Sequence, residues 1–177
     1  MQLRAPIAIK AALKSLTEVI APAIDSDNKL AQEQFGLIVG LLTLIGDRLP
    51  LEFHYDLDEL RRLTRLGHDL QEIAVSAALA EPVTGGEDVL ARAAASPDEL
   101  IAAIAALRSA IGQTAQQLSA RSDPVSQRGV RAILANASEQ QLRERSWLLL
   151  QGWETNPASV PAIETLIGAP SSGRKGQ

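Results

Sequence analysis

The chain has 177 residues, a formal net charge of −4 and no cysteine. The missing cysteine excludes disulfide frameworks, thiol catalysis and zinc sites with thiolate ligands. The acidic balance argues against a general nucleic-acid binder, which usually carries a basic excess. Hydrophobic residues make up 46% of the chain, but aromatic residues only 3%. Alanine and leucine dominate the apolar part, which favours helices over strands.

The first predicted helix runs from Pro6 to Ala21. Proline suits the first helical turn, where its missing N–H costs nothing. Pro22 ends the helix, because the residue before a proline is pushed out of the helical region. One face carries apolar residues at helical spacing, namely Ile9, Leu13, Leu16 and Ile20.

The second predicted helix covers residues 27–49 and follows the capping residues at 25–28. Its later part, 35–46, is apolar almost all round, and a helix without a polar face is normally buried on all sides. We therefore expect it to be the central helix. Gly36 and Gly40 form a small-xxx-small pair, which predicts that a neighbouring helix packs closely there.

No segment predicts export or membrane insertion. Lys10 and Lys14 interrupt the apolar stretch at the N-terminus, unlike a secretory signal. The run 35–46 has about a dozen residues, whereas a membrane-spanning helix needs roughly 20. We expect a soluble, cytoplasmic protein that binds neither membrane nor nucleic acid.

The third predicted helix covers residues 57–80, after a short extended connection at 51–56. Its apolar residues alternate at spacings of three and four, as in a coiled-coil seam: Leu63, Leu66, Leu70, Ile73 and Ala77. Glycine and proline at 81–86 predict a break. A short fourth helix at 87–95 follows.

The fifth predicted helix covers residues 97–120, with Ser96 as its N-cap. Its seam is Leu100, Ile104, Leu107, Ile111, Thr114 and Leu118. The sixth helical region covers 124–154, with a possible break at 136–138, where Ser138 and Gln141 fit a capping box. A last amphipathic piece lies at 160–167.

The sequence contains no strand pair, hairpin signal or fixed repeat. The predicted fold class is all-α, an antiparallel bundle of about six helices around the buried apolar helix near 27–49. Residues 1–168 form a single domain, and 169–177 form a polar C-terminal tail. The sequence leaves open whether residues 157–177 dock on their own chain or on another.

No residue set predicts catalysis or a cofactor. The chain lacks a glycine-rich phosphate loop and a nucleophile elbow. His54, Asp56 and Asp58 are weak candidates for a metal site, because imidazole and carboxylates can share a divalent ion. The simpler interpretation is that the two aspartates begin a helix. His68 and Glu72 lie one turn apart and form at most a weak surface pair.

Two further groups are candidates for contacts with an anion or a protein partner. Arg61, Arg62 and Arg65 form a basic cluster, since arginine favours bidentate contacts with carboxylate or phosphate. Self-pairing with neighbouring acids is the simpler interpretation. Trp147 and Trp153 are either core residues or interface anchors, because tryptophan is enriched in binding hot spots.

The leading hypothesis is a non-enzymatic helical bundle that acts through protein association, as a homodimer. The alternative is a carrier or sensor that holds an apolar small molecule, for example of acyl type, between helices. Its expected lining is Phe35, Phe53, His54 and Tyr55. A metal-dependent enzyme is the third hypothesis.

Overall fold

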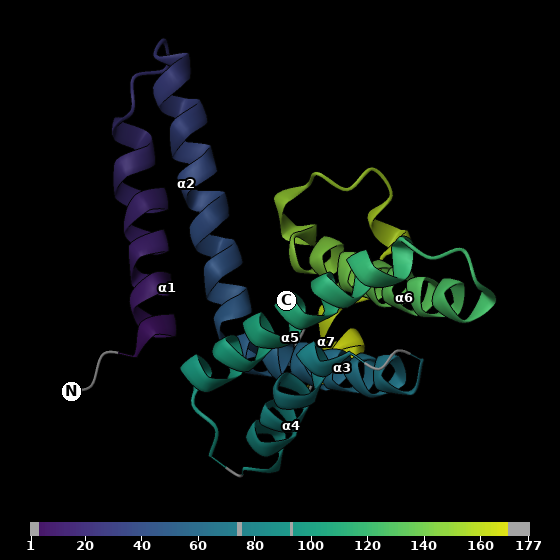
Figure 1. Ribbon diagram of the computed structural model, residues 1–177. Helices are drawn as coiled ribbons and strands as arrows, with labels where there is room; N and C mark the ends of the chain where they lie inside the picture. Colours follow the sequence, from purple (N-terminus) through teal and green to yellow (C-terminus); the bar gives the residue numbers. More distant parts are fainter. Residues whose placement is uncertain (1–3, 74–75, 93, 170–177) are drawn as a thin grey trace. The chain divides into compact units, whose positions relative to one another are not determined.

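The computed structural model describes residues 4–73, 76–92 and 94–169, and these residues contain helices but no strand. The all-α prediction is therefore confirmed. These described residues form six helices of 11 to 24 residues and one four-residue helix, whose arrangement can be followed in Figure 1. In chain order they are α1 (Ala5–Ser15), α2 (Lys29–Arg48), α3 (Glu52–Ile73), α4 (Ala77–Ala91), α5 (Pro97–Ser119), α6 (Pro124–Trp147) and α7 (Ile163–Leu166).

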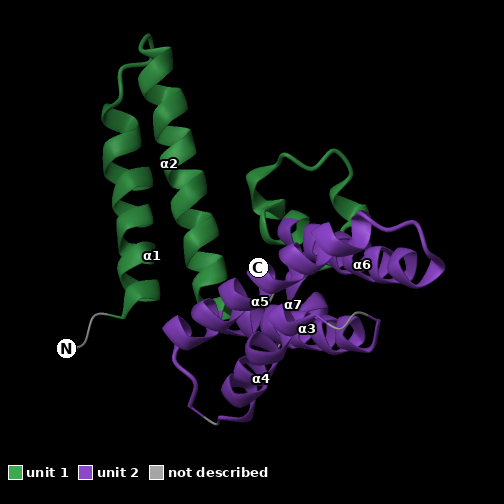
Figure 2. Cartoon of the chain, in the orientation of Figure 1, with its two compact units in different colours: residues 1–52, 145–162 green, residues 53–144, 163–177 purple. Residues whose placement is uncertain are grey.

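The helices are divided between two compact units (Figure 2). Unit 1 consists of residues 1–52 and 145–162, and unit 2 of residues 53–144 and 163–177. The division groups residues by their packing, and the single domain predicted over 1–168 stays a prediction. Of the predicted polar tail at 169–177, residues 170–177 lie outside the described part of the chain.

Helices α1 and α2 of unit 1 form a helical hairpin (Figure 1). A π-helical turn (Leu16–Ile20) and a 3-10 turn (Ala21–Ala23) extend α1 up to the turn. Asn28 then caps α2, since its side chain accepts a hydrogen bond from the Ala31 N–H at 3.0 Å. The two helices run in opposite directions, so a Cβ added to Gly46 would lie 3.1 Å from Ile9 Cγ2.

The hairpin does not bury α2 on all sides, contrary to the sequence prediction. Leu44 and Arg48 are the buried residues of this helix. A Cβ added to Gly36 or Gly40 would meet no described atom within 4 Å. The close helix contact expected at these glycines is therefore absent from the described residues, and an apolar surface of α2 remains exposed.

Unit 2 holds the hydrophobic core, in α3, α4 and α5. The predicted seam of α5 is confirmed, because all six of its residues from Leu100 to Leu118 are buried. Leu63, Leu66 and Leu70 of the α3 seam are buried as well. Ser96 caps α5 in a capping box with Glu99, and Asp123 precedes α6 and accepts from the Ser126 N–H at 2.9 Å.

Three predicted boundaries are wrong, because tertiary packing overrides local signals. Residues 52–56 belong to α3 rather than to an extended connection. Helix α4 continues through Pro82, since Leu79, Val83 and Gly86 are buried on one face of it. Helix α6 has no break at 136–138, where the Ser138 hydroxyl donates to the Leu134 carbonyl at 2.9 Å.

Candidate functional site

Helix α2 exposes a continuous stripe of large apolar side chains. Their exposed fractions range from 40% for Ile45 to 67% for Leu30. With 100° between successive residues, the set falls within an arc of about 100°. This surface, called the α2 stripe below, consists of Leu30, Leu37, Ile38, Leu41 and Ile45.

A heptad seam along α2 overlaps the α2 stripe at Leu30, Leu37 and Leu41. Leu30, Gln34, Leu37, Leu41, Leu44 and Arg48 follow one another at spacings of four, three, four, three and four residues. This alternation is typical of a helix that packs along another helix with knobs-into-holes contacts. Gln34 is the polar residue inside this otherwise apolar part of the seam.

Residues 145–162 of unit 1 cover the C-terminal end of this seam. The Arg48 guanidinium donates from Nε to the Trp147 carbonyl at 2.9 Å and from Nη2 to the Ser146 carbonyl at 3.2 Å. It also lies over the Trp147 ring, 5.7 Å from the ring centroid. Gln151 Nε2 donates to the Gly40 carbonyl at 3.2 Å. The seam is therefore covered at Leu44 and Arg48 and open from Leu30 to Leu41.

Charged residues border the stripe at its ends and on the neighbouring helix. Between Glu33 and Asp47, α2 carries no charge. Lys14 of α1 and Glu18 of the π-helical turn that follows form an exposed ion pair at 3.8 Å. Among the described residues, one helical stretch, within Lys29–Ile73, is by length and composition alone apolar enough to cross a membrane.

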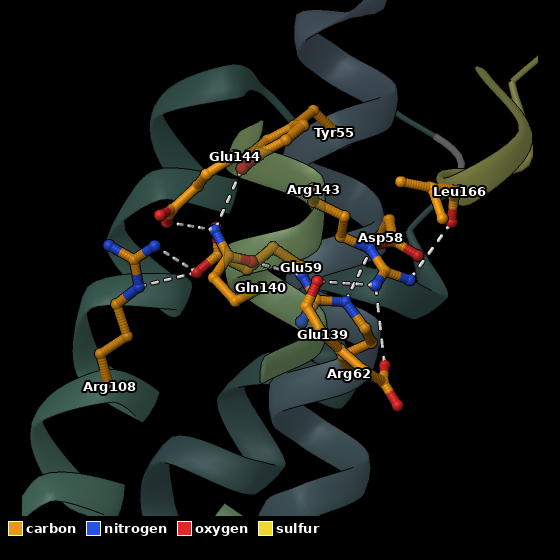
Figure 3. A network of polar contacts seen from close by, with 10 residues as sticks. All are labelled: Tyr55, Asp58, Glu59, Arg62, Arg108, Glu139, Gln140, Arg143, Glu144 and Leu166. Carbon is orange, nitrogen blue, oxygen red and sulfur yellow. Dashed lines mark hydrogen bonds and ion pairs between the residues drawn. The ribbon is translucent and has the colours of Figure 1, made fainter. Parts of the chain in front are cut away.

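Unit 2 contains a polar network centred on Asp58 (Figure 3). Asp58 Oδ2 accepts from Arg62 Nε at 2.9 Å and from Arg143 Nε at 2.6 Å. Arg62 also donates to Gln140 Oε1 at 2.6 Å, and Arg143 to the Leu166 carbonyl at 3.2 Å. The network therefore joins α3, α6 and α7 with one carboxylate between two guanidinium groups.

The remaining contacts of the network extend to α5. The buried Glu59 carboxylate accepts from Arg108 Nε at 2.7 Å. The Tyr55 hydroxyl accepts from Gln140 Nε2 at 3.0 Å (Figure 3). Burial raises the pKa of Tyr55, and this effect exceeds the opposing effect of the Gln140 hydrogen bond. Tyr55 therefore stays neutral and holds α3 against α6.

The four residues expected to line an apolar ligand site are divided between the units. Phe35 lies on α2 in unit 1, while Phe53, His54 and Tyr55 lie in the first turn of α3 in unit 2. Phe53 is 41% exposed and meets the His54 ring edge-on, with centroids 6.2 Å apart. Tyr55 lines an open pocket in which Glu59 and Arg108 stand beside the apolar residues Ile101, Ile104 and Ala105.

The metal candidates do not assemble into a site. No three His, Asp or Glu side chains among the described residues are grouped closely enough to hold a metal ion. Of the candidates His54, Asp56 and Asp58, the last is already neutralised by Arg62 and Arg143. The structure therefore gives no support to metal chemistry at the start of α3.

The basic cluster is separated onto two faces of α3. Arg62 is buried in the polar network, whereas Arg61 and Arg65 are exposed on another face. The tryptophans also differ: Trp147 is half-buried beside Arg48, and Trp153 is 73% exposed. The sequence could not separate these roles, because adjacent helix positions point 100° apart and nothing local says which face is covered.

Sequence reasoning missed Gln140, Arg143 and Arg108 as partners of the α3 acids. The contacts of Arg62 with Gln140 and of Asp58 with Arg143 join residues 78 and 85 positions apart. The available signal was indirect: Gln140, Arg143 and Glu144 lie three and four residues apart, which places them on one face of α6.

Comparisons with protein-family models, with curated proteins and with solved structures found no match. What the chain can do is therefore inferred from its own residues.

Proposed function

We propose that this chain is a non-enzymatic helical protein that associates with a second copy of itself through the α2 stripe. The observation that carries the proposal is the heptad seam of α2, which is covered at Leu44 and Arg48 and open from Leu30 to Leu41. In the dimer, α2 becomes the buried apolar helix that its sequence predicts. A two-fold axis places the same stripe on both partners.

The stripe suits another helix of the same kind. Knobs-into-holes packing needs apolar residues at alternating spacings of three and four, which the α2 seam supplies. The uncharged stretch between Glu33 and Asp47 avoids like-charge contacts when two copies of α2 meet. The two copies share every feature of the surface, so no unlike partner has to be assumed.

A lipid bilayer fits the hairpin less well. The 13 uncharged residues from Gln34 to Gly46 span about 20 Å of helix, against about 30 Å for a hydrocarbon core. Insertion of the hairpin would also carry into lipid the exposed side chains of Lys14 on α1 and of Glu18 in the π-helical turn that follows. Charged groups at the centre of a bilayer are costly.

The exposed area is enough for a reversible dimer. Burying a whole leucine or isoleucine side chain contributes about 1.5–3 kcal/mol, so the exposed half contributes about 1 kcal/mol. The α2 stripes of two copies then supply on the order of 10 kcal/mol. Association costs at least about 4 kcal/mol, which leaves a Kd on the order of 10–100 µM.

The test is sedimentation equilibrium of the full chain from about 1 to 500 µM, a range that brackets the expected Kd. The wild type is expected to shift from 18.9 kDa towards twice that mass. The double variant Leu37→Lys with Leu41→Lys is expected to stay monomeric, because it places two ammonium groups on each stripe. Leu134→Lys is the matched control, since Leu134 is a leucine on α6 with 60% exposure, close to the 59% of Leu37.

Two outcomes contradict the proposal. One is a wild type that remains a monomer across the whole range. The other is a double variant that dimerises like the control. Co-sedimentation with phosphatidylcholine vesicles distinguishes the membrane alternative: a wild type that is monomeric in solution but pellets with vesicles, while the double variant does not, assigns the α2 stripe to lipid.

The carrier of an apolar ligand lined by Phe35, Phe53, His54 and Tyr55 stays a prediction.

A further inference from the structure

Unit 2 has an open pocket between α3 and α4, with a volume of about 530 Å³. This size is typical of sites for small organic molecules. The lining from α3 includes Arg61, Thr64, Arg65 and His68, and the lining from α4 includes Glu87 and Leu90. This surface is called the α3–α4 pocket below, and it is separate from both the α2 stripe and the Asp58 network.

The sequence of α3 explains why cations gather there. Arg61, Arg65 and His68 are spaced by four and three residues, so they lie on one face of the helix. Arg62, one position away, turns into the Asp58 network. The exposed Arg61 and Arg65 side chains have no ion pair or hydrogen bond with any described residue. These two guanidinium groups are therefore available to an external anion.

Charge in the pocket favours an anion despite one acid. Glu87 is the only acidic side chain among the described residues that line it, and it is hydrogen-bonded to His68 Nε2 at 2.8 Å. Glu87 is thus paired with the imidazole of His68, while neither arginine is paired with an acid among the described residues. Arginine pairs preferentially with phosphate and carboxylate oxygens, because its planar fork donates two parallel hydrogen bonds.

The inner wall of the pocket supplies an apolar surface beside a buried threonine. Thr64 is 5% exposed, and its Oγ1 has no hydrogen-bond partner among the described atoms. A buried hydroxyl without a partner is uncommon, because its lost hydration is not replaced. Close approach of the helices places it there, since a Cβ added to Gly86 would lie 2.7 Å from this oxygen. Leu90 beside it offers an apolar contact.

We propose that the α3–α4 pocket binds a phosphate monoester, with the phosphate held by Arg61 and Arg65 and the organic group packed on Leu90. A doubly charged phosphate suits two forked cations better than a single carboxylate does. The apolar wall accounts for an organic substituent rather than inorganic phosphate alone. The proposal does not depend on dimerisation, because every pocket residue belongs to unit 2.

The test is isothermal titration calorimetry of the full chain with phenyl phosphate, and separately with inorganic phosphate. Phenyl phosphate is expected to bind at least ~5-fold more tightly, because the ring adds apolar contact with Leu90. Arg61→Gln and Arg65→Gln are each expected to weaken binding at least ~10-fold, as expected for loss of a charged hydrogen bond. Arg128→Gln on α6 is the matched control, since it removes an exposed arginine elsewhere in unit 2.

A further variant tests the lining. Glu87→Gln is expected to strengthen binding ~3-fold or more, because it removes the opposing charge from the pocket. Circular dichroism checks that each variant stays folded.

The source of the phosphate monoester is resolved by vesicles that contain phosphatidic acid in phosphatidylcholine. Pelleting that requires Arg61 and Arg65 indicates a lipid headgroup, and titration by phenyl phosphate without pelleting indicates a free small molecule. Wild-type affinity in both Arg61→Gln and Arg65→Gln overturns the proposal. So does the absence of a binding signal for phenyl phosphate at 10 mM, about the weakest binding that calorimetry detects, in both the wild type and Glu87→Gln.

Discussion

The carboxylate of Asp58 pairs with two guanidinium groups, those of Arg62 and Arg143 (Figure 3). The substitution Asp58→Ala removes it and leaves both cations in place. The side chains of Arg62 and Arg143 are only 7% and 11% exposed, so water cannot replace the lost carboxylate. Arg62 Nη1 already lacks a hydrogen-bond partner among the described atoms.

Breaking a buried ion pair by removing one partner costs about 3–5 kcal/mol. Other contacts remain after the substitution. Arg62 still donates to Gln140 Oε1 at 2.6 Å, and Arg143 still donates to the Glu139 and Leu166 carbonyls at 3.2 Å and pairs with the Glu139 carboxylate at 3.7 Å. We therefore expect a loss near the lower end, about 3 kcal/mol, in the free energy of unfolding.

The assay is urea unfolding followed by far-ultraviolet circular dichroism, with hydrogen exchange of α3 and α6 peptides to locate the effect. Glu18→Ala is the control, because it breaks an ion pair whose side chains are 72% and 63% exposed. An exposed pair of this kind contributes less than about 0.5 kcal/mol. The slope of the unfolding curve is expected to stay constant for both variants.

A loss below about 1 kcal/mol for Asp58→Ala would refute the view that Asp58 compensates two buried cations. A triple variant examines the same reasoning in the opposite direction. Asp58→Leu, Arg62→Met and Arg143→Met together remove every charge at the centre, and buried ion pairs replaced by apolar residues often keep their stability. This variant is expected to be more stable than Asp58→Ala.

The remaining predictions concern the seam, the helix contacts and acid pH. Gln34→Leu is expected to strengthen dimerisation about 10-fold in sedimentation equilibrium, because a polar seam residue costs stability. Gly86→Ala is expected to destabilise the fold by about 1–3 kcal/mol through its contact with Thr64, whereas Gly36→Ala, which meets nothing within 4 Å, gains up to about 1 kcal/mol in urea unfolding. Hydrogen bonds from Ser96 and Arg92 lower the pKa of Glu99. Its stabilisation is therefore complete above its ordinary pKa of 4.5 and disappears as the pH falls through the lowered value of the folded chain, so the difference in urea midpoint between wild type and Glu99→Gln should shrink between pH 6 and pH 2.

Local sequence patterns predicted those helices whose buried residues recur at regular spacing along one face. The α5 seam is confirmed because its apolar spacing, its Ser96 cap and its acidic first turn all indicate the same helix. Pro82 and the glycine pair at 85–86 indicated a break, yet Val83 and Gly86 are buried and hold α4 intact. Packing against other helices decided this element, and no local rule contains that information.

The exposure of α2 could not be predicted for a related reason. An apolar pattern indicates that one face of a helix avoids water, but it does not indicate which other surface covers that face. The polar network could not be predicted for a different reason, since Asp58 and Arg143 are 85 positions apart in the sequence. Either residue alone resembles any other charged residue on a helix, so only the folded arrangement distinguishes them.

The discontinuity of unit 1 has a consequence during protein synthesis. The carbonyl partners of Arg48, those of Ser146 and Trp147, lie 98 and 99 residues further along the chain and are synthesised later. At about 5–20 residues per second, the ribosome needs about 5–20 s to produce them. During this interval α2 leaves the ribosome without residues 145–162, which contact it at Gly40 and Arg48 in the folded chain. Neighbouring nascent chains on one messenger RNA therefore present the C-terminal end of the seam to each other, which finished proteins keep covered at Arg48.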